Sequence, residues 1–283
     1  MTYQAFLNKQ MKRADSLGKE REAIKLLVLE LSGLDGANFF LKLTEELPVE
    51  EEKRFLTAID KYLIDGIPVQ HILGYSYFYG YRMIVNKEVL IPRPETEELV
   101  GYVLQKYDDV FDGQKVDVVD VGTGSGAVAV ALVKEEPNMS VYATDISETA
   151  LEVAVQNAKN NDANVTFYLG DMLQPLIERN LKFDILVSNP PYIPEDEYVE
   201  SIVKDNEPHV ALFGGVDGMY FYDIILSNAS KILKDINIIA FEHSYNKGEQ
   251  MIALAKKYFP EGKVELIKDL NGKDRFTIIV NGK

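Results

Sequence analysis

The tetrapeptide Asn189-Pro190-Pro191-Tyr192 holds the groups best suited to chemistry, because it directly follows an apolar run at 183–188. Proline fixes φ at about −65° and forces the residue before it into extended geometry, so the carbonyls of this turn point in set directions. The Asn189 side-chain oxygen and the Pro190 carbonyl are two acceptors, which match the two donors of a planar NH2 group. The pattern predicts a site that binds an amino or amide nitrogen. A purely structural proline-rich loop is the alternative.

A glycine-rich loop is the second candidate. It follows an apolar run at 116–121 and precedes a stretch rich in Ala and Val, which predicts a strand, a turn and a helix. Glycines allow a sharp turn and a close approach to a ligand, and a helix N-terminus offers unpaired N–H groups. The same spacing, ending in Ala127, also fits the dinucleotide pattern G-x-G-x-x-G/A, so a nicotinamide or flavin enzyme stays open. The expected cofactor-binding residues of the loop are Gly122, Thr123, Gly124, Ser125 and Gly126.

Two acidic residues also follow apolar runs. Asp145 ends the run at 141–144, where it could accept hydrogen bonds from ribose hydroxyls in either kind of cofactor. Asp171 and Met172 follow the run at 165–169, where an acid beside an apolar residue could bracket an adenine ring. Taken alone, Asp171 could simply be a helix N-cap. We expect these residues to share one sheet edge with the loop and with Asn189.

The elements that must position these residues alternate from Pro92 onward. Short apolar runs typical of buried parallel strands are separated by helical patterns. A tight turn at 271–274 leads into a terminal strand that we expect to pair antiparallel. The expected strands are 116–121, 141–144, 165–169, 183–188, 236–241 and 275–280. The predicted fold class is α/β, with a mostly parallel sheet and an antiparallel terminal strand.

The chain before this pattern predicts a different structure. Apolar residues recur at helical spacing over 23–31 and 55–63, which indicates a small all-α domain at 1–74. An aromatic and β-branched stretch with Gly80 inside it predicts a β-hairpin linker at 75–90. The α/β domain then occupies 91–283.

Composition narrows the functional classes. The chain of 283 residues has no cysteine, and its 3 histidines have no metal-ligand spacing, so we expect no metal site. Residues 1–90 carry a net charge of −1 and residues 91–283 a net charge of −14, which argues against a bare nucleic-acid substrate. The polar start at 1–20 and the lack of a long apolar stretch predict a cytoplasmic protein with no membrane association. The sequence has no exposed heptad repeat of apolar residues that would indicate a dimer, so we expect a monomer.

The order of these motifs resembles that of S-adenosylmethionine-dependent methyltransferases of the Rossmann-like class. In that class the glycine loop holds the methionine part of the cofactor, the acid at Asp145 holds the ribose, and Asp171-Met172 lies against adenine. The resemblance implies that S-adenosylmethionine is the cofactor and S-adenosylhomocysteine the product. It also places Asn189 next to the cofactor.

The Asn-Pro-Pro-Tyr motif is shared by enzymes that methylate nitrogens conjugated with a π-system, namely adenine N6, guanine N2 and the carboxamide of glutamine. The resemblance implies that Asn189 and the Pro190 carbonyl accept the two N–H groups of the substrate, while Pro191 and Tyr192 complete the substrate site. Tyr192 would form a wall beside the substrate plane or the cationic sulfonium. A DNA adenine or rRNA guanine methyltransferase therefore remains the rival within the same chemistry.

Three further blocks, at 67–74, 90–98 and 207–218, resemble those of the release-factor glutamine methyltransferase family. That family implies an N-terminal helical substrate-recognition domain, a hairpin linker and a catalytic domain. It implies N5 methylation of the glutamine in the Gly-Gly-Gln motif of class I peptide-chain release factors. Arg93 and Glu95 would then border the substrate and cofactor cleft, with a surface salt bridge as the alternative. Met172, where relatives often carry an aromatic, leaves the adenine contact less defined.

Two further residues and two alternative kinds of protein also follow from the sequence. Glu242 and His243 follow the expected strand at 236–241, and we expect them to have a structural role there. From outside methyl transfer, a dinucleotide oxidoreductase and a non-catalytic Rossmann-like binding module both remain open. Cofactor binding and substitution of Asn189 separate them from a methyltransferase.

Overall fold

The computed structural model describes residues 1–282, and the chain forms two compact units. The first unit comprises Met1–Tyr75 together with Val199–Asn206. The second comprises Ser76–Tyr198 and the chain from Glu207 onward. The all-α and α/β parts predicted from the sequence therefore correspond to separate cores, with one short exception around residue 200.

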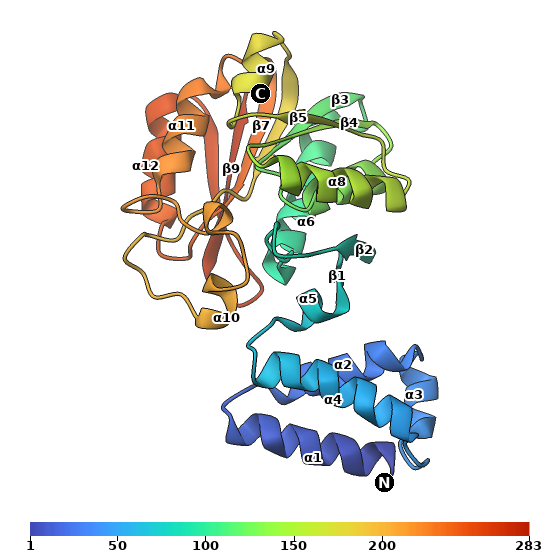
Figure 1. Ribbon diagram of the computed structural model, residues 1–283. Helices are drawn as coiled ribbons and strands as arrows, with labels where there is room; N and C mark the ends of the chain where they lie inside the picture. The colour runs from blue at the N-terminus through green and yellow to red at the C-terminus, as the bar shows by residue number, and fades with distance from the viewer. Residues whose placement is uncertain (283) are drawn as a thin grey trace. The chain divides into compact units, whose positions relative to one another are not determined.

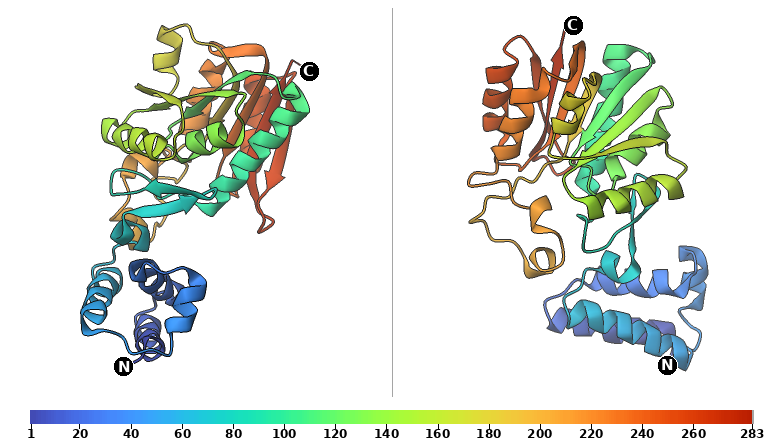
Figure 2. Two further views of the ribbon diagram at one scale, coloured as in Figure 1. Left: turned by 90° about the vertical axis from the view of Figure 1, so that its right-hand side faces the viewer. Right: turned by 45° about the horizontal axis from the view of Figure 1, so that its top comes forward.

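The first unit is helical because its apolar residues form stripes along each helix. Ile24, Leu27 and Val28 recur at helical spacing on α2 and are fully buried in the core of this unit. Gly33 ends α2 in the left-handed conformation with φ 70°, which glycine adopts without strain. Figure 2 shows the helices packed against one another. They are α1 (Tyr3–Ser16), α2 (Arg21–Ser32), α3 (Gly36–Lys42), α4 (Val49–Leu63) and α5 (Val69–Leu73).

A short segment from late in the sequence completes this unit. Helix α10 (Ser201–Lys204) brings Ile202 against the apolar core of the first unit. The Asn206 side-chain amide donates a hydrogen bond to the Gly66 carbonyl at 2.9 Å. The chain thus leaves the second unit after Tyr198 and returns to it at Glu207, an arrangement that the sequence did not predict.

The predicted hairpin is present as β1 (Tyr75–Phe78) and β2 (Tyr81–Ile84). Its two connecting residues, Tyr79 and Gly80, have φ values of 52° and 81°. Positive φ at both positions is the geometry of a two-residue hairpin turn that matches the twist of the strands. Tyr79 adopts this conformation although it is not a glycine, and its backbone N–H donates a hydrogen bond to Glu97 Oε1 at 2.9 Å.

The second unit is built on a seven-stranded sheet of order β5-β4-β3-β6-β7-β9-β8. All neighbouring pairs from β5 to β7 are parallel, and β9 runs antiparallel to both β7 and β8, so the predicted α/β class with an antiparallel terminal strand is confirmed. The strands are β3 (Val116–Val121), β4 (Met139–Asp145), β5 (Val165–Leu169), β6 (Phe183–Ser188), β7 (Leu233–Glu242), β8 (Lys263–Lys268) and β9 (Asp274–Asn281).

Strand β8 is the element that the sequence analysis missed. It lies at the sheet edge and has no fully buried residue, because one side of its backbone pairs with β9 and the other is free of strands. An edge strand of alternating charged and apolar residues lacks the continuous apolar run that identifies the central strands. The expected strands at 141–144 and 236–241 are also longer at both ends in the structure.

Helices cover both faces of the sheet. Val118 of β3 packs in a core under α6, α7 and α8, whereas its neighbour Val119 packs in a second core under α9, α11 and α12, because successive strand residues point to opposite faces. Figure 1 shows α11 and α12 on the opposite side of the sheet from α6 and α8. The helices are α6 (Pro94–Phe111), α7 (Ala127–Glu135), α8 (Glu148–Asn160), α9 (Gln174–Glu178), α11 (Tyr220–Ala229) and α12 (Gly248–Tyr258), with a 3-10 turn at His209–Ala211. Within residues 1–282, no helix combines the length and apolar character that a membrane crossing requires.

Candidate active site

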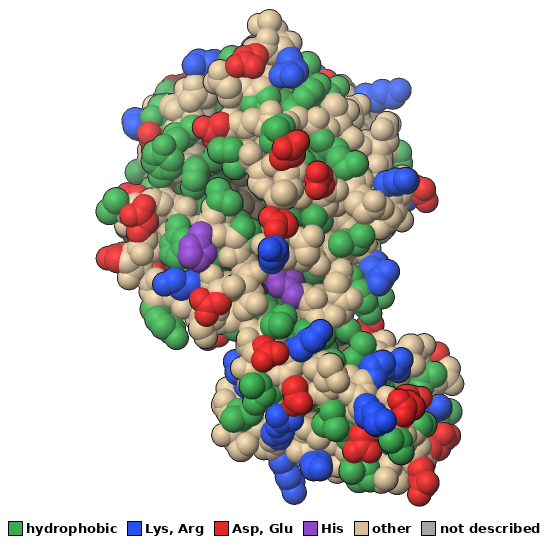
Figure 3. All heavy atoms as spheres, in the orientation of Figure 1, with side chains coloured by type: hydrophobic (Ala, Val, Ile, Leu, Met, Phe, Trp, Pro, Cys, Tyr) green, Lys and Arg blue, Asp and Glu red, His purple; other side chains and the backbone are tan. Residues whose placement is uncertain are grey.

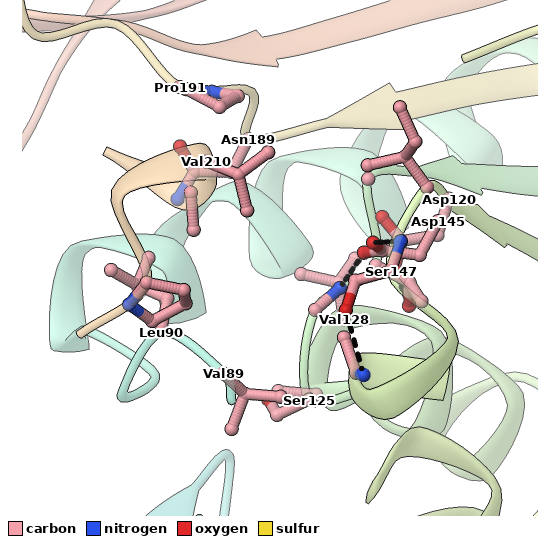
Figure 4. Close-up of a pocket in the computed structure, with 18 of the residues that line it drawn as sticks. Val89, Leu90, Asp120, Ser125, Val128, Asp145, Ser147, Asn189, Pro191 and Val210 are labelled. Atoms are coloured by element: carbon pink, nitrogen blue, oxygen red, sulfur yellow. Dashed lines mark hydrogen bonds between the residues drawn. The ribbon is translucent and has the colours of Figure 1, made fainter. Parts of the chain in front are cut away.

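A pocket lies in the second unit at the carboxyl ends of the central parallel strands. Its walls include the residues that follow β3, β4, β5 and β6. Strands β3 and β6 are neighbours at the point where the strand order reverses, which is where open α/β sheets bind ligands. In Figure 4, Asn189, Pro191 and Val210 lie on one side of the pocket, and Asp145 and Ser147 face them across it.

The glycine loop forms one wall of the pocket. Gly122 and Gly124 have φ values of 74° and 55°, and a Cβ atom added to either would meet no atom within 4 Å. Their backbone therefore borders open space that a ligand can approach. Gly126 differs, because a Cβ there would lie 3.0 Å from Cβ of Ala154. Gly126 serves the close packing of α7 on α8 and does not line the pocket, unlike the predicted Thr123 and Ser125, which do.

Asp145 holds the glycine loop in place. Its Oδ2 atom accepts the Gly124 N–H at 2.8 Å and its Oδ1 atom accepts the Ser147 N–H at 2.9 Å. Burial raises the pKa of this carboxyl, while the two backbone hydrogen bonds act to lower it. Each carboxylate oxygen can accept more than one hydrogen bond, so Asp145 retains acceptor capacity for hydroxyl groups in the pocket.

Asp120 is a pocket residue that the sequence analysis did not select, although it lies only two residues before Gly122. It is only 2% exposed and accepts a hydrogen bond from the Thr123 hydroxyl at 2.6 Å. Burial raises the pKa of Asp120 to about 7, the hydrogen bond from Thr123 opposes that rise, and the charge of Asp145 adds to it. A buried acid with a raised pKa therefore lies at the pocket.

Asp171 and Met172 both line the pocket, as predicted. The Gly170 N–H donates to the Asp145 carbonyl at 2.9 Å, which joins the end of β5 to the end of β4. The Asp171 carbonyl accepts the Gln174 N–H at 2.9 Å, so this turn runs directly into α9. The structure thus brings the two predicted acids of neighbouring strands to one pocket.

The four residues of the Asn-Pro-Pro-Tyr turn have different positions. Asn189 and Pro191 line the pocket, whereas Pro190 is buried beside it and Tyr192 packs at the border of the apolar core under α11. Burial raises the pKa of Tyr192 to about 12, so its hydroxyl stays protonated at neutral pH. Gly214 packs against this turn so closely that a Cβ there would lie 2.4 Å from the Pro191 oxygen.

Arg93 and Glu95 are separated by the structure. Arg93 lines the pocket and forms an ion pair with Glu207 at 2.7 Å, so it is both a cleft wall and a salt-bridge partner. The Glu207 side chain is only 1% exposed and also accepts the Ile91 N–H at 3.0 Å. Glu95 does not line the pocket. Its charge raises the pKa of Tyr192 and Glu242, which places it in their electrostatic environment.

Glu242 and His243 are both buried at the end of β7. His243 has its two ring nitrogens within 2.9 Å of the Thr277 hydroxyl and of the Ser244 carbonyl oxygen. Burial lowers the pKa of His243, which favours the neutral ring. These contacts fit the structural role expected for His243. Glu242 instead contacts the pocket residue Thr96, with its Oε2 atom accepting the Thr96 hydroxyl at 2.7 Å.

The remaining wall of the pocket is mostly apolar and was not assigned to the site from the sequence. Some of these residues come from the segments before α6 and around the 3-10 turn, where the family resemblance had singled out blocks of sequence but no individual apolar residue. Others come from the start of α7 and from the residue after β4. Together they include Val89, Leu90, Pro92, Val128, Ile146, Pro208, Val210 and Ala211. The pocket as a whole offers apolar surfaces beside carboxylate acceptors.

Comparisons with known proteins agree with this architecture. Residues 103–210 match the family model of the methyltransferase small domain. A methyltransferase from Pyrococcus furiosus superposes with a TM-score of 0.50 at 20% identity, over 82% of this chain and 98% of that one. The N-terminal domain of human METTL16 in complex with SAH superposes with a TM-score of 0.51 at 15% identity, over 86% of this chain and 85% of that one. Fold and site together define a Rossmann-like methyltransferase.

The sequence comparisons are more specific. Residues 6–74 match the PrmC N-terminal domain. The release factor glutamine methyltransferase of Bacillus subtilis is 45% identical over 91% of this chain and 90% of its own length. Those of Bacillus cereus, at 42% over 91% and 92%, and Staphylococcus aureus, at 35% over 97% and 98%, are similar over nearly the whole chain. This chain belongs to the release factor glutamine methyltransferase family.

Proposed function

We propose that this chain methylates the side-chain amide nitrogen (N5) of the glutamine in the Gly-Gly-Gln motif of class I peptide-chain release factors, with S-adenosylmethionine as methyl donor. The observation that carries the proposal is that Asn189 lines the same pocket as the glycine loop and Asp145. The residue proposed to bind the amide and the loop proposed to hold the cofactor thus open onto one cavity. The names of the relatives support the substrate class.

The pocket residues fit S-adenosylmethionine. The open space beside Gly122 and Gly124 suits the methionine portion, and the free acceptor capacity of Asp145 suits the ribose hydroxyls. Asp171 and Met172 suit the two sides of an adenine ring, because one is an acceptor and the other apolar. When bound, the cofactor supplies a methyl group attached to a positively charged sulfur.

Asn189 and Pro190 are proposed to orient the glutamine amide. In the proposed complex the Asn189 oxygen and the Pro190 carbonyl accept the two amide hydrogens of the glutamine, which aims its nitrogen at the methyl carbon. Tyr192 lies behind the residues that line the pocket and closes that side of the proposed glutamine site. The nitrogen forms the new bond to carbon as the carbon–sulfur bond breaks with its electrons on sulfur, and the amide proton leaves to solvent. The products are N5-methylglutamine and S-adenosylhomocysteine.

A protein substrate also suits the charge of the catalytic part. Residues 91–283 carry a net charge of −14, whereas enzymes that bind nucleic acids draw much affinity from basic side chains on phosphates. On the face drawn in Figure 3, blue basic side chains are interspersed with red acidic ones. We also propose that the enzyme acts in the cytoplasm, where release factors and the methyl donor are both available. We further propose that it acts as a monomer.

The decisive experiment is incubation of the chain with labelled S-adenosylmethionine and purified release factors, followed by peptide mapping. Label on the glutamine of Gly-Gly-Gln is expected. Label on adenine or guanine in added nucleic acid would favour the rival methyltransferases instead. Calorimetric binding of NAD in preference to S-adenosylmethionine would indicate an oxidoreductase, and neither binding nor label would indicate a non-catalytic module.

The helical part at 1–74 is proposed to recognise the release factor away from its reacting glutamine. A short peptide that carries Gly-Gly-Gln offers the reacting group alone, so it should have a lower kcat/KM than the whole factor. Steady-state methylation of both substrates by the complete chain tests this role. Equal kcat/KM values for peptide and factor would exclude it.

A further inference from the structure

The Asn189 side chain is tied to a buried pair of polar residues from two other elements. Its Nδ2 atom donates to the Thr96 Oγ1 atom at 3.0 Å, and the Thr96 hydroxyl donates to the Glu242 Oε2 atom at 2.7 Å. Thr96, in the first turn of α6, is 6% exposed, and Glu242, the last residue of β7, is 1% exposed. The three side chains form one continuous chain of hydrogen bonds that begins at the pocket.

The sheet fixes the positions of both ends of this chain. Strands β6 and β7 are parallel with Ser188 paired to Phe241, so Asn189 and Glu242 are the next residues on two adjacent strands. The Glu242 carbonyl accepts the buried Tyr222 hydroxyl at 2.8 Å. These contacts fix the Glu242 backbone, and Thr96 bridges the Glu242 side chain to Asn189.

The hydrogen-bond directions determine which way the Asn189 amide faces. A threonine hydroxyl has one proton, and when Glu242 is ionised Thr96 gives that proton to the carboxylate, so Thr96 then accepts from Asn189. Turning the amide over would bring the Asn189 oxygen against the Thr96 oxygen with no proton between them. The amide nitrogen is thereby held on the protein side, and the amide oxygen is the atom left to accept from a substrate N–H.

Stability alone does not account for an acid at this position. Among residues 1–282, no lysine, arginine or histidine forms an ion pair with Glu242, and burial raises its pKa to about 7. The hydrogen bond from Thr96, the charge of Arg275 and the nearby Asn189 amide lower that pKa, and the charge of Glu95 raises it further. A buried carboxyl without an ion pair is costly, and an apolar side chain would fill the space at lower cost.

We propose that Thr96 and Glu242 are positioning residues, which hold the Asn189 amide with its nitrogen toward Thr96 and its oxygen toward the glutamine N–H. The proposal rests on the proposed function. It assigns these two residues to the reaction, although neither touches the reacting atoms. It predicts that they affect the rate of methyl transfer more than the binding of the cofactor.

The first test replaces Thr96 with the isosteric Val, which removes the hydroxyl and keeps the shape. With saturating S-adenosylmethionine and whole release factor, kcat should fall about tenfold, as expected for the loss of one ordinary hydrogen bond, while the calorimetric Kd for S-adenosylmethionine stays unchanged. Thr96→Ser should recover most of the rate, because it restores the hydroxyl. Thr277→Val is the matched control, since Thr277 is a buried threonine of the same unit whose hydroxyl lies 2.9 Å from His243 Nε2, and it should keep wild-type kcat.

The second test separates positioning from general packing. If Thr96 acts through Asn189, Thr96→Val should have no further effect on kcat in an Asn189→Ala background. Glu242→Gln keeps an acceptor for Thr96 and should be more active than Glu242→Leu. Wild-type kcat in Thr96→Val, or a full tenfold loss added to that of Asn189→Ala, would overturn the positioning role. Absence of glutamine methylation by the unaltered chain would instead overturn the proposed function on which it rests.

Discussion

The Oδ2 atom of Asp145 accepts the backbone N–H of Gly124 at 2.8 Å, so the acid at the end of β4 supports the glycine loop that follows β3. One residue therefore shapes the loop and, under the proposed function, also binds the ribose of the cofactor. Asp145→Ala should weaken S-adenosylmethionine binding about ten- to hundred-fold, because hydrogen bonds to a charged group each contribute about 1.5–3 kcal/mol. Isothermal titration calorimetry measures the change. Glu152→Ala, at an exposed position of α8, is the control, and equal Kd values for the two variants would exclude the role of Asp145.

Asn189 should matter for rate far more than for cofactor binding. Asn189→Ala removes the acceptor that we propose orients the glutamine, and loss of a preorganised group of this kind typically lowers kcat by about a hundredfold or more. Single-turnover methylation of a release factor provides the measurement, with the calorimetric Kd for S-adenosylmethionine recorded alongside. Asn164→Ala, at an exposed position before β5, should behave as wild type. A kcat for Asn189→Ala within a factor of two of wild type would remove Asn189 from the mechanism.

Asp120 should make stability depend on pH in the acid-to-neutral range. Burial raises its pKa in the folded chain to about 7 from an ordinary 3.8, so the folded state retains the proton that the unfolded state loses. Its contribution to stability is complete below pH 3.8 and is lost as pH rises to about 7, by an amount on the order of 4 kcal/mol at most. Asp120→Asn removes this loss. The difference in melting temperature between variant and wild type, without cofactor, should therefore grow from pH 4 to pH 8. A difference that does not change with pH would contradict the raised pKa.

Gly214 should be indispensable because of its neighbours. A Cβ there would lie 2.4 Å from the Pro191 oxygen and 2.8 Å from the Tyr192 Cα atom, and both are backbone atoms of the Asn-Pro-Pro-Tyr turn. Gly214→Ala must displace that turn and should lower kcat more than tenfold.

Gly101→Ala is the matched control for that substitution. Gly101 lies inside α6, and a Cβ there would meet no atom within 4 Å. Alanine should keep the activity and raise the unfolding free energy by about 0.5–1 kcal/mol, because it lowers the entropy of the unfolded chain. Methylation assays and thermal unfolding compare the pair. Full activity in Gly214→Ala would show that the turn tolerates displacement.

The sequence predicted the elements whose signals are local. Strands β3, β5 and β6 begin and end at the expected residues, because each is a short and mostly apolar run. In β3 and β6 that run marks a central strand buried on both faces, whereas β5 is a half-buried edge strand. The glycine loop, Asp145, Asp171, Met172 and Asn189 each follow such a run, so the common direction of parallel strands was enough to bring them to one pocket. Edge strand β8 has no comparable run and was missed.

Contacts between distant segments had no such signal. Thr96 and Glu242 are 146 residues apart, and Arg93 and Glu207 are 114 apart. Which strands become neighbours decides whether such residues meet, and spacing along the chain does not encode that order. Pocket-lining apolar residues such as Val210 were equally invisible, because an apolar side chain in a loop has the same appearance in a core and in a binding site.

Helix α10 has a consequence for experiments on the helical part. A truncated chain that starts at residue 76 would retain Ile202 and Asn206 but lose the apolar core and the Gly66 carbonyl that they contact. In such a chain the segment Val199–Asn206, which follows soon after the Asn-Pro-Pro-Tyr turn, would have lost the core against which Ile202 packs. Reduced activity of the truncated chain could then not separate the loss of release-factor recognition from the local unfolding of the segment around α10. Surface substitutions that leave the bundle intact are the cleaner way to dissect how the substrate is chosen.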